Sequence, residues 1–390
     1  MKLYLKKGDF MFTFFATCWG KVSAALMSAI LSFGFSVGAY IEPTTENSGK
    51  YLDENIENVI FLIGDGMGYN HLEKSKLERN IELTLDTFAI QGSSRTRSLT
   101  NDVTDSAAGG TALSCGIRTY NSAVGVYLLD PLDVFSHPIN ITELCRDNKM
   151  LTGVITTDET SGATPAAFSA YAKERYESED ITEDQMKSNI NLIWGTENGV
   201  ATKKMANENG YEYVTTYDEM MALKEGSKSF AQFTNDLWTL EQSDENNPTL
   251  SQMTEKAIDL LDDSENGFFL MVEGAHIDKH SHNNESEDMT EAMAEFDKSI
   301  KIALDFAKKD GNTLVVVTAD HETGAITLND NGEYEFTSDD HSEADVPLRV
   351  YGSEKLIKNN ETVNNYEIPI RIAYILGFTE EDFPVSKLVA

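Results

Sequence analysis

The sequence predicts an α/β fold with a doubly wound, mostly parallel central sheet flanked by helices. Four continuous apolar runs are typical of strands buried on both faces, and each run ends in residues that carry oxygen. A stretch with helical spacing separates the last two runs, and strands that alternate with helices indicate this fold class. In such sheets ligands bind beyond the carboxyl ends of the strands, where we expect the functional site.

The predicted strands cover residues 59–64, 153–157, 268–272 and 313–318. Asp65 follows the first run, Glu273 follows the third, and Asp320 comes two residues after the fourth. Between the last two runs, residues 286–309 place apolar side chains at helical spacing, so this segment should be a helix that packs on the sheet.

The composition limits the classes of function. The chain has 31 Lys and Arg residues against 65 Asp and Glu residues, a formal net charge of −34, and 41% of its residues are hydrophobic. That apolar content supports a large core and excludes a mostly disordered chain. The excess of carboxylates repels phosphate backbones, so we expect no nucleic-acid-binding surface.

The amino terminus predicts export. Lysines precede two apolar runs, over 11–16 and 22–40, which is typical of a signal peptide over residues 1–39. The alternative is an uncleaved membrane anchor, which would keep the protein on a membrane. With cleavage, we expect a periplasmic or extracellular protein without a membrane contact. Cysteines occur at three positions, 18, 115 and 145, and they provide no disulfide framework.

Residues 40–390 are expected to form a single domain. The stretch 176–247 is acidic, rich in Asn and weakly periodic, with a helical pattern around 217–224. We expect this stretch to be an insertion that lies beside the sheet.

Two glycine-rich motifs carry candidate chemistry. Asp65 lies in Ile-Gly-Asp-Gly-Met-Gly at 63–68, where a carboxylate at a strand end can bind a metal, although the same motif is often a plain turn. Ser106 lies in Val-Thr-Asp-Ser-Ala-Ala at 103–108, before a run of small residues. The serine is either part of a helix cap or a nucleophile beside an anion that the helix start stabilises.

Metal-ligating residue types concentrate in the last third of the chain. Asp278 and His282 lie four residues apart, so on a helix both could reach one zinc ion, whereas a solvated polar loop is the alternative. His276 and His280 are interpreted as residues that do not bind the metal. The adjacent pair Asp320 and His321 offers two further ligands, and His341 follows in an acidic turn. Three carboxylates, three histidines and one serine suit phosphoryl transfer assisted by two metal ions.

These motifs resemble the alkaline phosphatase family of secreted zinc and magnesium phosphomonoesterases. The resemblance covers residues 58–352 and includes Ala-Thr-Pro-Ala-Ala at 163–167, the block 273–282 and Thr-Ala-Asp-His at 318–321. It implies that Ser106 is the nucleophile and becomes phosphorylated. It also implies three metal sites: one zinc on Asp65, Asp320 and His321, a second zinc on Asp278, His282 and His341, and one magnesium on Asp65, Thr164 and Glu273.

The resemblance also assigns two cationic residues. Arg175 lies eleven residues after Thr164, the family's spacing for a phosphate-binding arginine, whose guanidinium can hold two phosphate oxygens. Without the resemblance, Arg175 would read as the end of a helix over 165–174. Lys279 matches a lysine that reaches the phosphate through water in some bacterial relatives.

Three positions depart from the family pattern. Gly162 replaces an Asp or His beside the magnesium site, and Asp340 precedes His341 where some relatives have Gly. The segment between His321 and His341 is a short version of the crown that builds the dimer interface in many relatives, so a homodimer is left open.

The resulting prediction is hydrolysis of small-molecule phosphate monoesters at alkaline pH, with a broad substrate range and a phosphoserine intermediate. One alternative is a superfamily enzyme that acts on phosphodiesters or sulfate esters. The other is an inactive envelope protein that binds metal or phosphate.

Overall fold

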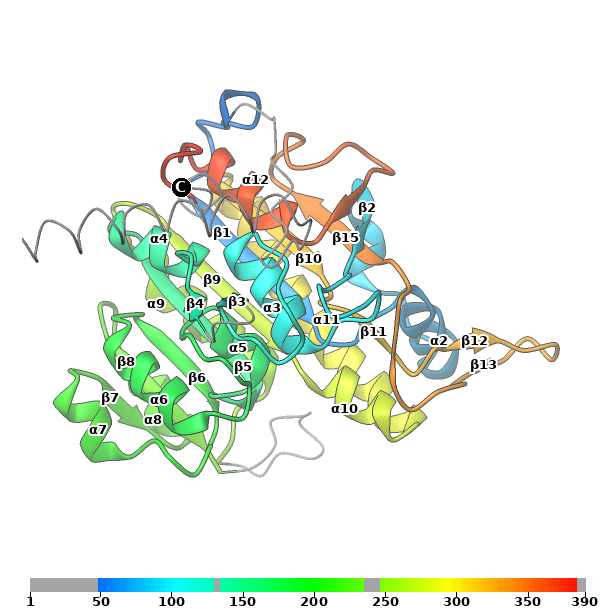
Figure 1. The fold of residues 1–390 in the computed structure, drawn as a ribbon, viewed down its shortest axis with the longest axis horizontal. Coiled ribbons are helices and arrows are strands. Elements are labelled where there is room, and N and C mark those ends of the chain that lie inside the picture. Colours follow the sequence, from blue (N-terminus) through cyan, green and yellow to red (C-terminus); the bar gives the residue numbers. More distant parts are fainter. Residues whose placement is uncertain (1–47, 130–133, 235–245, 384–390) are drawn as a thin grey trace, which may run out of the picture.

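A central sheet of ten strands runs through the protein (Figure 1). The computed structural model describes residues 48–129, 134–234 and 246–383, so the predicted signal peptide lies outside the described residues. In spatial order the strands are β16 (Thr362–Asn364), β2 (Ile90–Arg95), β15 (Val346–Tyr351), β10 (Thr313–Thr318), β1 (Asn58–Gly64), β9 (Phe268–Gly274), β5 (Leu151–Glu159), β6 (Leu192–Thr196), β8 (Ser229–Phe233) and β7 (Glu212–Val214).

The four predicted strands form the centre of this sheet. Strand β1 lies between β10 and β9 and is parallel to both, and β5 is parallel to β9. Strand β15 is antiparallel to β10 and β2, which makes the sheet mixed but mostly parallel. The predicted fold class is therefore confirmed.

Helices cover both faces of the sheet. The α-helices are α2 (Tyr69–Arg79), α3 (Ser106–Cys115), α4 (Ile141–Asp147), α5 (Ala163–Ala167), α6 (Ser178–Lys187), α7 (Lys203–Glu208), α8 (Tyr217–Ala222), α9 (Leu250–Leu261), α10 (His276–His282), α11 (Ser286–Asp310) and α12 (Glu367–Ile375). Short 3-10 helices occur at Ser48–Lys50 and Thr84–Thr87. The predicted helix over 286–309 is confirmed as α11.

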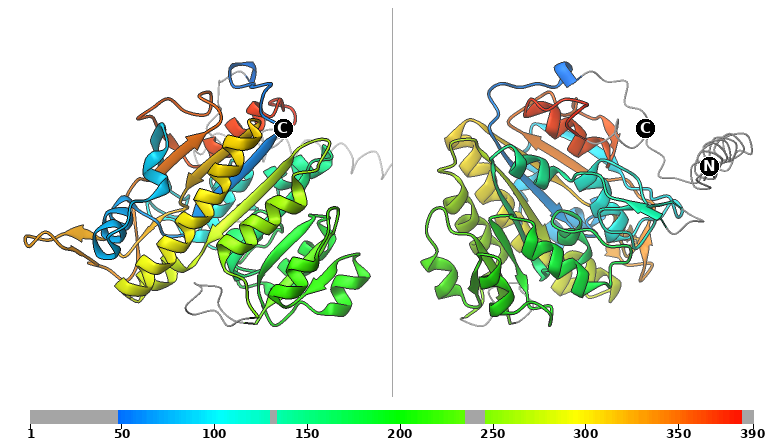
Figure 2. Two further views of the ribbon diagram at one scale, coloured as in Figure 1. Left: turned by 180° about the vertical axis from the view of Figure 1, so that it is seen from behind. Right: turned by 60° about the vertical axis from the view of Figure 1, so that its left-hand side comes forward.

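Side chains of β1 alternate between two hydrophobic cores. Leu62 packs in one core with Phe296 of α11 and residues of α9, the two helices that Figure 2 shows across one face. Phe61 belongs to the other core, together with Leu113 of α3 and residues of α4 and α12. Burial on both faces explains the continuous apolar runs in the sequence.

The stretch 176–247 differs from its prediction. It contributes β6, β7 and β8 to the main sheet, all in parallel pairing, so it extends the sheet and does not lie beside it. The strands are short, and their buried residues, such as Trp194 and Phe230, are separated by polar connections that hide the pattern. The helix expected around 217–224 is confirmed as α8.

Three two-stranded ribbons complete the described fold. They pair β11 (Glu322–Thr323) with β14 (His341–Ser342), β12 (Thr327–Leu328) with β13 (Tyr334–Glu335), and β3 (Tyr127–Leu129) with β4 (Val134–Ser136). The β12–β13 hairpin forms the short crown and extends away from the body of the protein (Figure 1). Among the described helices, none is both long enough and apolar enough to cross a membrane.

Candidate active site

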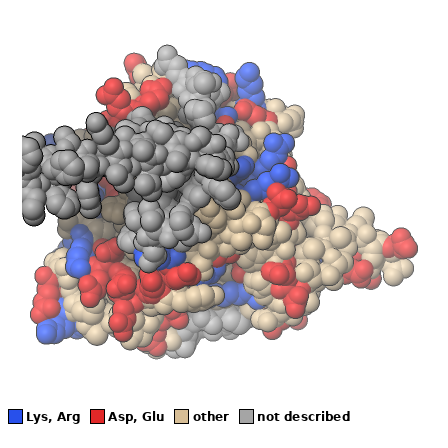
Figure 3. Space-filling model, in the orientation of Figure 1, with Lys and Arg blue, Asp and Glu red and all other residues tan. Residues whose placement is uncertain are grey.

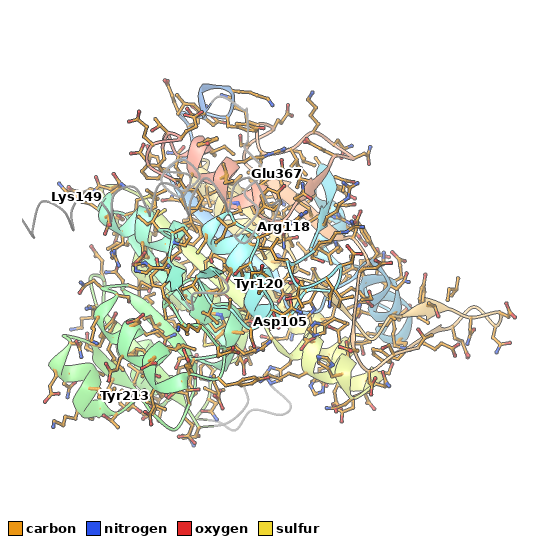
Figure 4. All side chains as sticks on the ribbon, viewed as in Figure 1. Asp105, Arg118, Tyr120, Lys149, Tyr213 and Glu367 are labelled. Atoms are coloured by element: carbon orange, nitrogen blue, oxygen red, sulfur yellow. The ribbon has the colours of Figure 1, made fainter. Side chains whose placement is uncertain are left out.

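The carboxyl edge of the sheet brings the predicted site residues together. Asp65 follows β1, Glu273 lies near the end of β9, and Asp320 follows β10, three adjacent parallel strands. Helix α3 begins at this edge, and Figure 4 shows Asp105, the residue before Ser106, in the middle of the molecule. Side chains that are far apart in the sequence therefore meet at one place.

Asp65, Asp320 and His321 form the first ligand cluster. One ligand atom from each lies within 4.8 Å of the others, and all three residues are buried. His321 Nε2 lies 3.3 Å from Asp65 Oδ1 and 3.4 Å from Asp320 Oδ2. Neither of these carboxylate oxygens has a hydrogen-bond partner in the described part of the chain. Buried polar atoms are almost always satisfied, so these oxygens fit a site that binds a cation.

Thr323 fixes the tautomer of His321. Its hydroxyl donates to Asp278 Oδ1, since a carboxylate can only accept, and Thr323 Oγ1 lies 3.2 Å from His321 Nδ1. The Thr323 proton is committed to Asp278, so His321 Nδ1 must donate, and the neutral ring then presents a bare lone pair at Nε2. That lone pair points toward the oxygens of Asp65 and Asp320.

Asp278, His282 and His341 form the second ligand cluster. His282 Nδ1 donates to the Asp339 carbonyl at 2.6 Å, and His341 Nδ1 donates to the Thr104 carbonyl at 2.8 Å. Because carbonyls only accept, each ring has a bare Nε2 atom in its neutral form, and the two Nε2 atoms lie 3.0 Å apart. Asp278 carboxylate oxygens lie 3.4 Å and 3.6 Å from these atoms. In that form three acceptors converge at one place, which is the arrangement of a cation site.

Ser106 is the first residue of α3 and lies beside the first cluster. Its Oγ is 3.2 Å from His321 Nε2, and the side chain is buried. Asp105 takes the N-cap position, where Oδ1 accepts from the Ala108 N–H at 3.0 Å. The capping role that the sequence left open for this motif thus belongs to Asp105, and Ser106 Oγ remains available at the positive end of the helix dipole.

Arg175 reaches the site through an ion pair with Asp105. Its Nη1 lies 3.2 Å from Asp105 Oδ2, which also accepts from the Ser122 N–H at 2.9 Å. Arg175 does not end a helix, because α5 stops at Ala167 and the next helix begins at Ser178. The guanidinium is therefore anchored to the residue beside Ser106.

Thr164 and Glu273 lie at the junction of α5 with β5 and β9. Thr164 is fully buried and its Oγ1 has no hydrogen-bond partner in the described part of the chain. Glu273 is buried and accepts a hydrogen bond from the Thr156 hydroxyl. The charge of Glu273 also acts on Asp65, so the two carboxylates share one electrostatic environment.

Burial and like charges disturb the acid–base behaviour of these groups. Burial, with the charges of Asp320 and Asp278, raises the pKa of Asp65 well above its usual value. Burial and the charge of Asp278 raise the pKa of Asp320 to about 7, and burial raises the pKa of Glu273 to about 8. Burial lowers the pKa of His321 well below its usual value, so the ring is neutral. In a buried site with several carboxylates, the ionised form is favoured only when a bound cation balances the negative charge.

Asp158 is a site residue that the sequence analysis missed. Its Oδ1 lies 2.5 Å from Lys279 Nζ, and its charge adds to burial in raising the pKa of Glu273. A Cβ atom at Gly162 would lie 2.5 Å from Asp158 Oδ2, so this carboxylate occupies the space that a side chain at 162 would need. The sequence contained a pattern that could have identified Asp158, because this residue comes soon after the predicted strand 153–157, as Asp65 comes after the predicted strand 59–64.

Gly66 permits the close approach of the two clusters. It has a φ of +73°, in the left-handed region, and a Cβ there would lie 2.9 Å from Asp278 backbone and side-chain atoms. Its N–H donates to Asp320 Oδ1 at 3.3 Å. By contrast, His276 and His280 lie outside both clusters and bond to Thr157 and Glu285.

An open cleft of about 680 Å³ gives access to these groups. Ser106, Arg175 and Lys279 line it, together with Asp278 and His341 of the second cluster. An α/β sheet whose carboxyl edge gathers cation ligands around a helix-start serine, in an open polar cleft, has the arrangement of a hydrolase for small anionic esters.

The comparisons with known proteins agree on one family. A sequence model of the alkaline phosphatase family matches residues 56–195 and 194–368. Alkaline phosphatase 4 of Bacillus subtilis is 34% identical over 328 residues, which are 78% of this chain and 70% of that protein. Alkaline phosphatase of Escherichia coli is 28% identical, with 77% of this chain and 82% of that protein covered.

A solved structure supports the same assignment. The alkaline phosphatase from the Antarctic bacterium TAB5 is 31% identical, with a TM-score of 0.71, and the match covers 83% of this chain and 99% of that one. The chain belongs to the alkaline phosphatase family. It is a phosphatase enzyme, and its substrates are small-molecule phosphate esters.

Proposed function

We propose that this enzyme hydrolyses phosphate monoesters of many alcohols at alkaline pH through a phosphoserine intermediate at Ser106. The observation that carries the proposal is the convergence of two acceptor clusters beside the Ser106 hydroxyl at the start of α3. Carboxylate and bare imidazole groups in such clusters require cations, and an in-line phosphoryl transfer requires positive charge on both the attacking and the leaving oxygen.

The donor sets fit two zinc ions and one magnesium ion. Zinc in catalytic sites takes three nitrogen or oxygen ligands and keeps an open position, which suits each cluster. We assign one zinc to Asp65, Asp320 and His321 and the other to Asp278, His282 and His341. Magnesium prefers oxygen ligands, and we assign it to Asp65, Thr164 and Glu273. A solved structure of a TAB5 phosphatase variant contains bound magnesium.

Bound metal ions supply Lewis-acid stabilisation of the oxygen atoms that gain charge and favour the ionised form of the nucleophile. Ser106 gives up its hydroxyl proton as Oγ forms a bond to phosphorus, the bond from phosphorus to the alcohol oxygen breaks, and the alcohol leaves with one proton. Water then attacks the phosphorus, the bond from phosphorus to Oγ breaks, one proton of the water returns to Ser106 Oγ, and phosphate leaves. Each step conserves the phosphoryl group, first on the serine and then on water.

The cationic side chains of the cleft hold the substrate. Arg175 is anchored by Asp105 next to Ser106, so its fork can bind two non-bridging phosphate oxygens. Lys279 is held by Asp158 and is assigned to phosphate contact through water. The cleft is open around these residues, so the alcohol part meets few constraints and a broad substrate range follows.

Three further properties belong to the same proposal. Ligand carboxylates with raised pKa values must ionise to bind metal, which favours activity above neutral pH. We keep the assignment of residues 1–39 to a signal peptide, of 40–390 to a single catalytic domain, and of the mature enzyme to the periplasm or the exterior. A homodimer stays a prediction that light scattering of the purified enzyme tests.

The deciding experiment is hydrolysis of a chromogenic phosphate monoester against pH, with metal content measured on the same sample. We expect turnover that a chelator abolishes, that zinc and magnesium restore, and that Ser106→Ala removes while the metal content persists. A fully metallated enzyme that leaves monoesters intact but cleaves a diester or a sulfate ester would contradict the proposal. Failure on all three ester classes would favour a binding protein.

A further inference from the structure

Asp340 is fixed at the mouth of the active-site cleft. Its Oδ1 accepts from the His341 N–H at 2.8 Å, and its N–H donates to Ser338 Oγ at 3.0 Å. Its carbonyl accepts from the Gly324 N–H at 3.0 Å, which ties it to the β11–β14 ribbon. Asp340 lines the same cleft as Ser106, yet its side chain is exposed.

The charged side chains of the cleft other than Asp340 either pair with one another or belong to the ligand clusters. Two cationic side chains line it, and each already pairs with a carboxylate: Arg175 with Asp105 and Lys279 with Asp158. Asp65 and Asp278 belong to the two ligand clusters. Asp340 belongs to neither cluster, and it forms no ion pair with a Lys or Arg side chain among the described residues. Its negative charge is therefore not compensated at the cleft mouth.

The position of Asp340 relates it to one part of the substrate. It precedes His341, a member of the second cluster. Ser106 Oγ, the attacking oxygen of the proposed function, lies beside His321 of the first cluster, so an in-line transfer leaves the second cluster for the oxygen of the departing alcohol. Every monoester brings the same phosphoryl group, so repulsion of that group is common to all substrates. What differs between substrates is the charge on the alcohol, and that part lies on the side of the cleft where Asp340 is fixed.

We propose that Asp340 is a specificity-determining residue that selects monoesters of neutral or cationic alcohols over those of anionic alcohols. The inference rests on the proposed function and names the substrate class of the same site. A single charge acting over ~7 Å in a largely aqueous setting changes kcat/KM by a factor of roughly 3 to 8. Solvent exposure makes this effect sensitive to salt.

Three probes of similar size test the proposal: 3-phosphoglycerate with an anionic alcohol, glycerol 3-phosphate with a neutral one, and phosphoethanolamine with a cationic one. We compare the wild-type enzyme with Asp340→Asn, which keeps the acceptor oxygen for the His341 N–H. The matched control is Glu343→Gln, because Glu343 is exposed, lies two residues beyond His341 and does not line the cleft. It makes the same change in net charge.

We expect Asp340→Asn to raise the kcat/KM ratio of phosphoglycerate to glycerol phosphate about 3- to 8-fold and to lower that of phosphoethanolamine to glycerol phosphate. Glu343→Gln should leave both ratios within about twofold, and the wild-type preference should weaken in salt of about 0.5 M. Ratios between substrates do not depend on the fraction of active enzyme, so partial misfolding of a variant does not mimic the effect.

Equal changes for all three probes in Asp340→Asn would overturn the inference, because the residue would then act on the shared phosphoryl group or on His341. Unchanged ratios would overturn it as well. If the fully metallated wild-type enzyme hydrolyses none of the three probes, the proposed function itself fails. If the probes are hydrolysed but the kcat/KM ratios are the same in the wild type and in Asp340→Asn, only the inference on Asp340 fails and the proposed function stands.

Discussion

His282 and His341 direct their Nε2 atoms at each other across 3.0 Å, and each ring donates its other nitrogen to a main-chain carbonyl. When both rings are neutral, two bare lone pairs at this distance repel, and a cation between them and the nearby Asp278 carboxylate relieves the repulsion. The proposed function assigns a metal ion to this position.

The first prediction concerns this cluster. His341→Ala removes one of its three ligands, so we expect one zinc ion fewer per chain after dialysis and a loss of most of the activity. Elemental analysis of the purified variant checks this. His137→Ala is the control, since His137 is an exposed histidine outside both clusters. Full zinc content in His341→Ala would refute the assignment.

The second prediction concerns Thr323, whose hydroxyl links Asp278 of one cluster to His321 of the other. Thr323→Val keeps the shape of the side chain but leaves both ligands without their partner. Loss of such partners typically weakens metal binding roughly 10- to 100-fold, whereas Thr323→Ser should bind almost as the wild type does. Competition titrations with a chelator measure the affinities. Equal affinities of the Val and Ser variants would contradict the role.

The third prediction concerns pH and the metal-free protein. The pKa of Glu273 is about 8 in the folded state, against 4.5 as its ordinary value, so between these values the folded state binds more protons than the unfolded state. Hence the free energy of unfolding falls as pH rises through this window. We expect the chelated enzyme to lose about 2–4 kcal/mol between pH 6 and pH 9, and bound metal to restore it.

Urea unfolding of the chelated enzyme at pH 6 and pH 9 measures this loss. Glu273→Gln is the control, because it removes the titrating group and should make the pH dependence smaller. A chelated wild type that is equally stable, or more stable, at pH 9 would show that Glu273 is ionised in the folded state without metal.

The fourth prediction couples Asp158 to Gly162. At Gly162 the φ of −52° suits any residue, so contacts alone oppose a side chain there: a Cβ would lie 2.5 Å from Asp158 Oδ2 and 3.0 Å from the Glu159 carbonyl oxygen. We expect Gly162→Ala to destabilise the wild type by about 1–2 kcal/mol and to cost less in an Asp158→Ala background, where only the Glu159 contact remains. Urea unfolding of the four proteins gives the coupling energy. A coupling near zero would mean that Asp158 moves aside freely.

The central fold could be predicted because each of its strands contains a mostly apolar run. β1, β5, β9 and β10 are buried on both faces, and that burial leaves a pattern that the sequence shows directly. In the 176–247 stretch β7 has only three residues, and β7 and β8 mix polar with apolar residues, so no long apolar run marks them. Their place in the sheet follows from the pairing of β6 with β5, of β8 with β6 and of β7 with β8, which only the folded chain reveals.

The candidate site likewise contains residues that sequence patterns indicate and contacts that they do not. Motif residues such as Ser106 and Asp320 follow strands or begin helices, where sequence patterns are informative. The ion pair between Arg175 and Asp105 joins residues 70 positions apart, and the Thr323 hydroxyl acts across 45 positions on Asp278. No local pattern encodes these contacts, because tertiary packing creates them.

The most direct test of the phosphoserine mechanism is to stop the reaction of the metallated enzyme with acid during turnover and to measure the mass of the peptide that contains Ser106. We expect an added phosphoryl group on Ser106 that forms with a monoester, disappears when the substrate is exhausted, and is absent in Ser106→Ala. Fast hydrolysis with no phosphoryl group on Ser106 at any time, or undiminished turnover by Ser106→Ala, would contradict it.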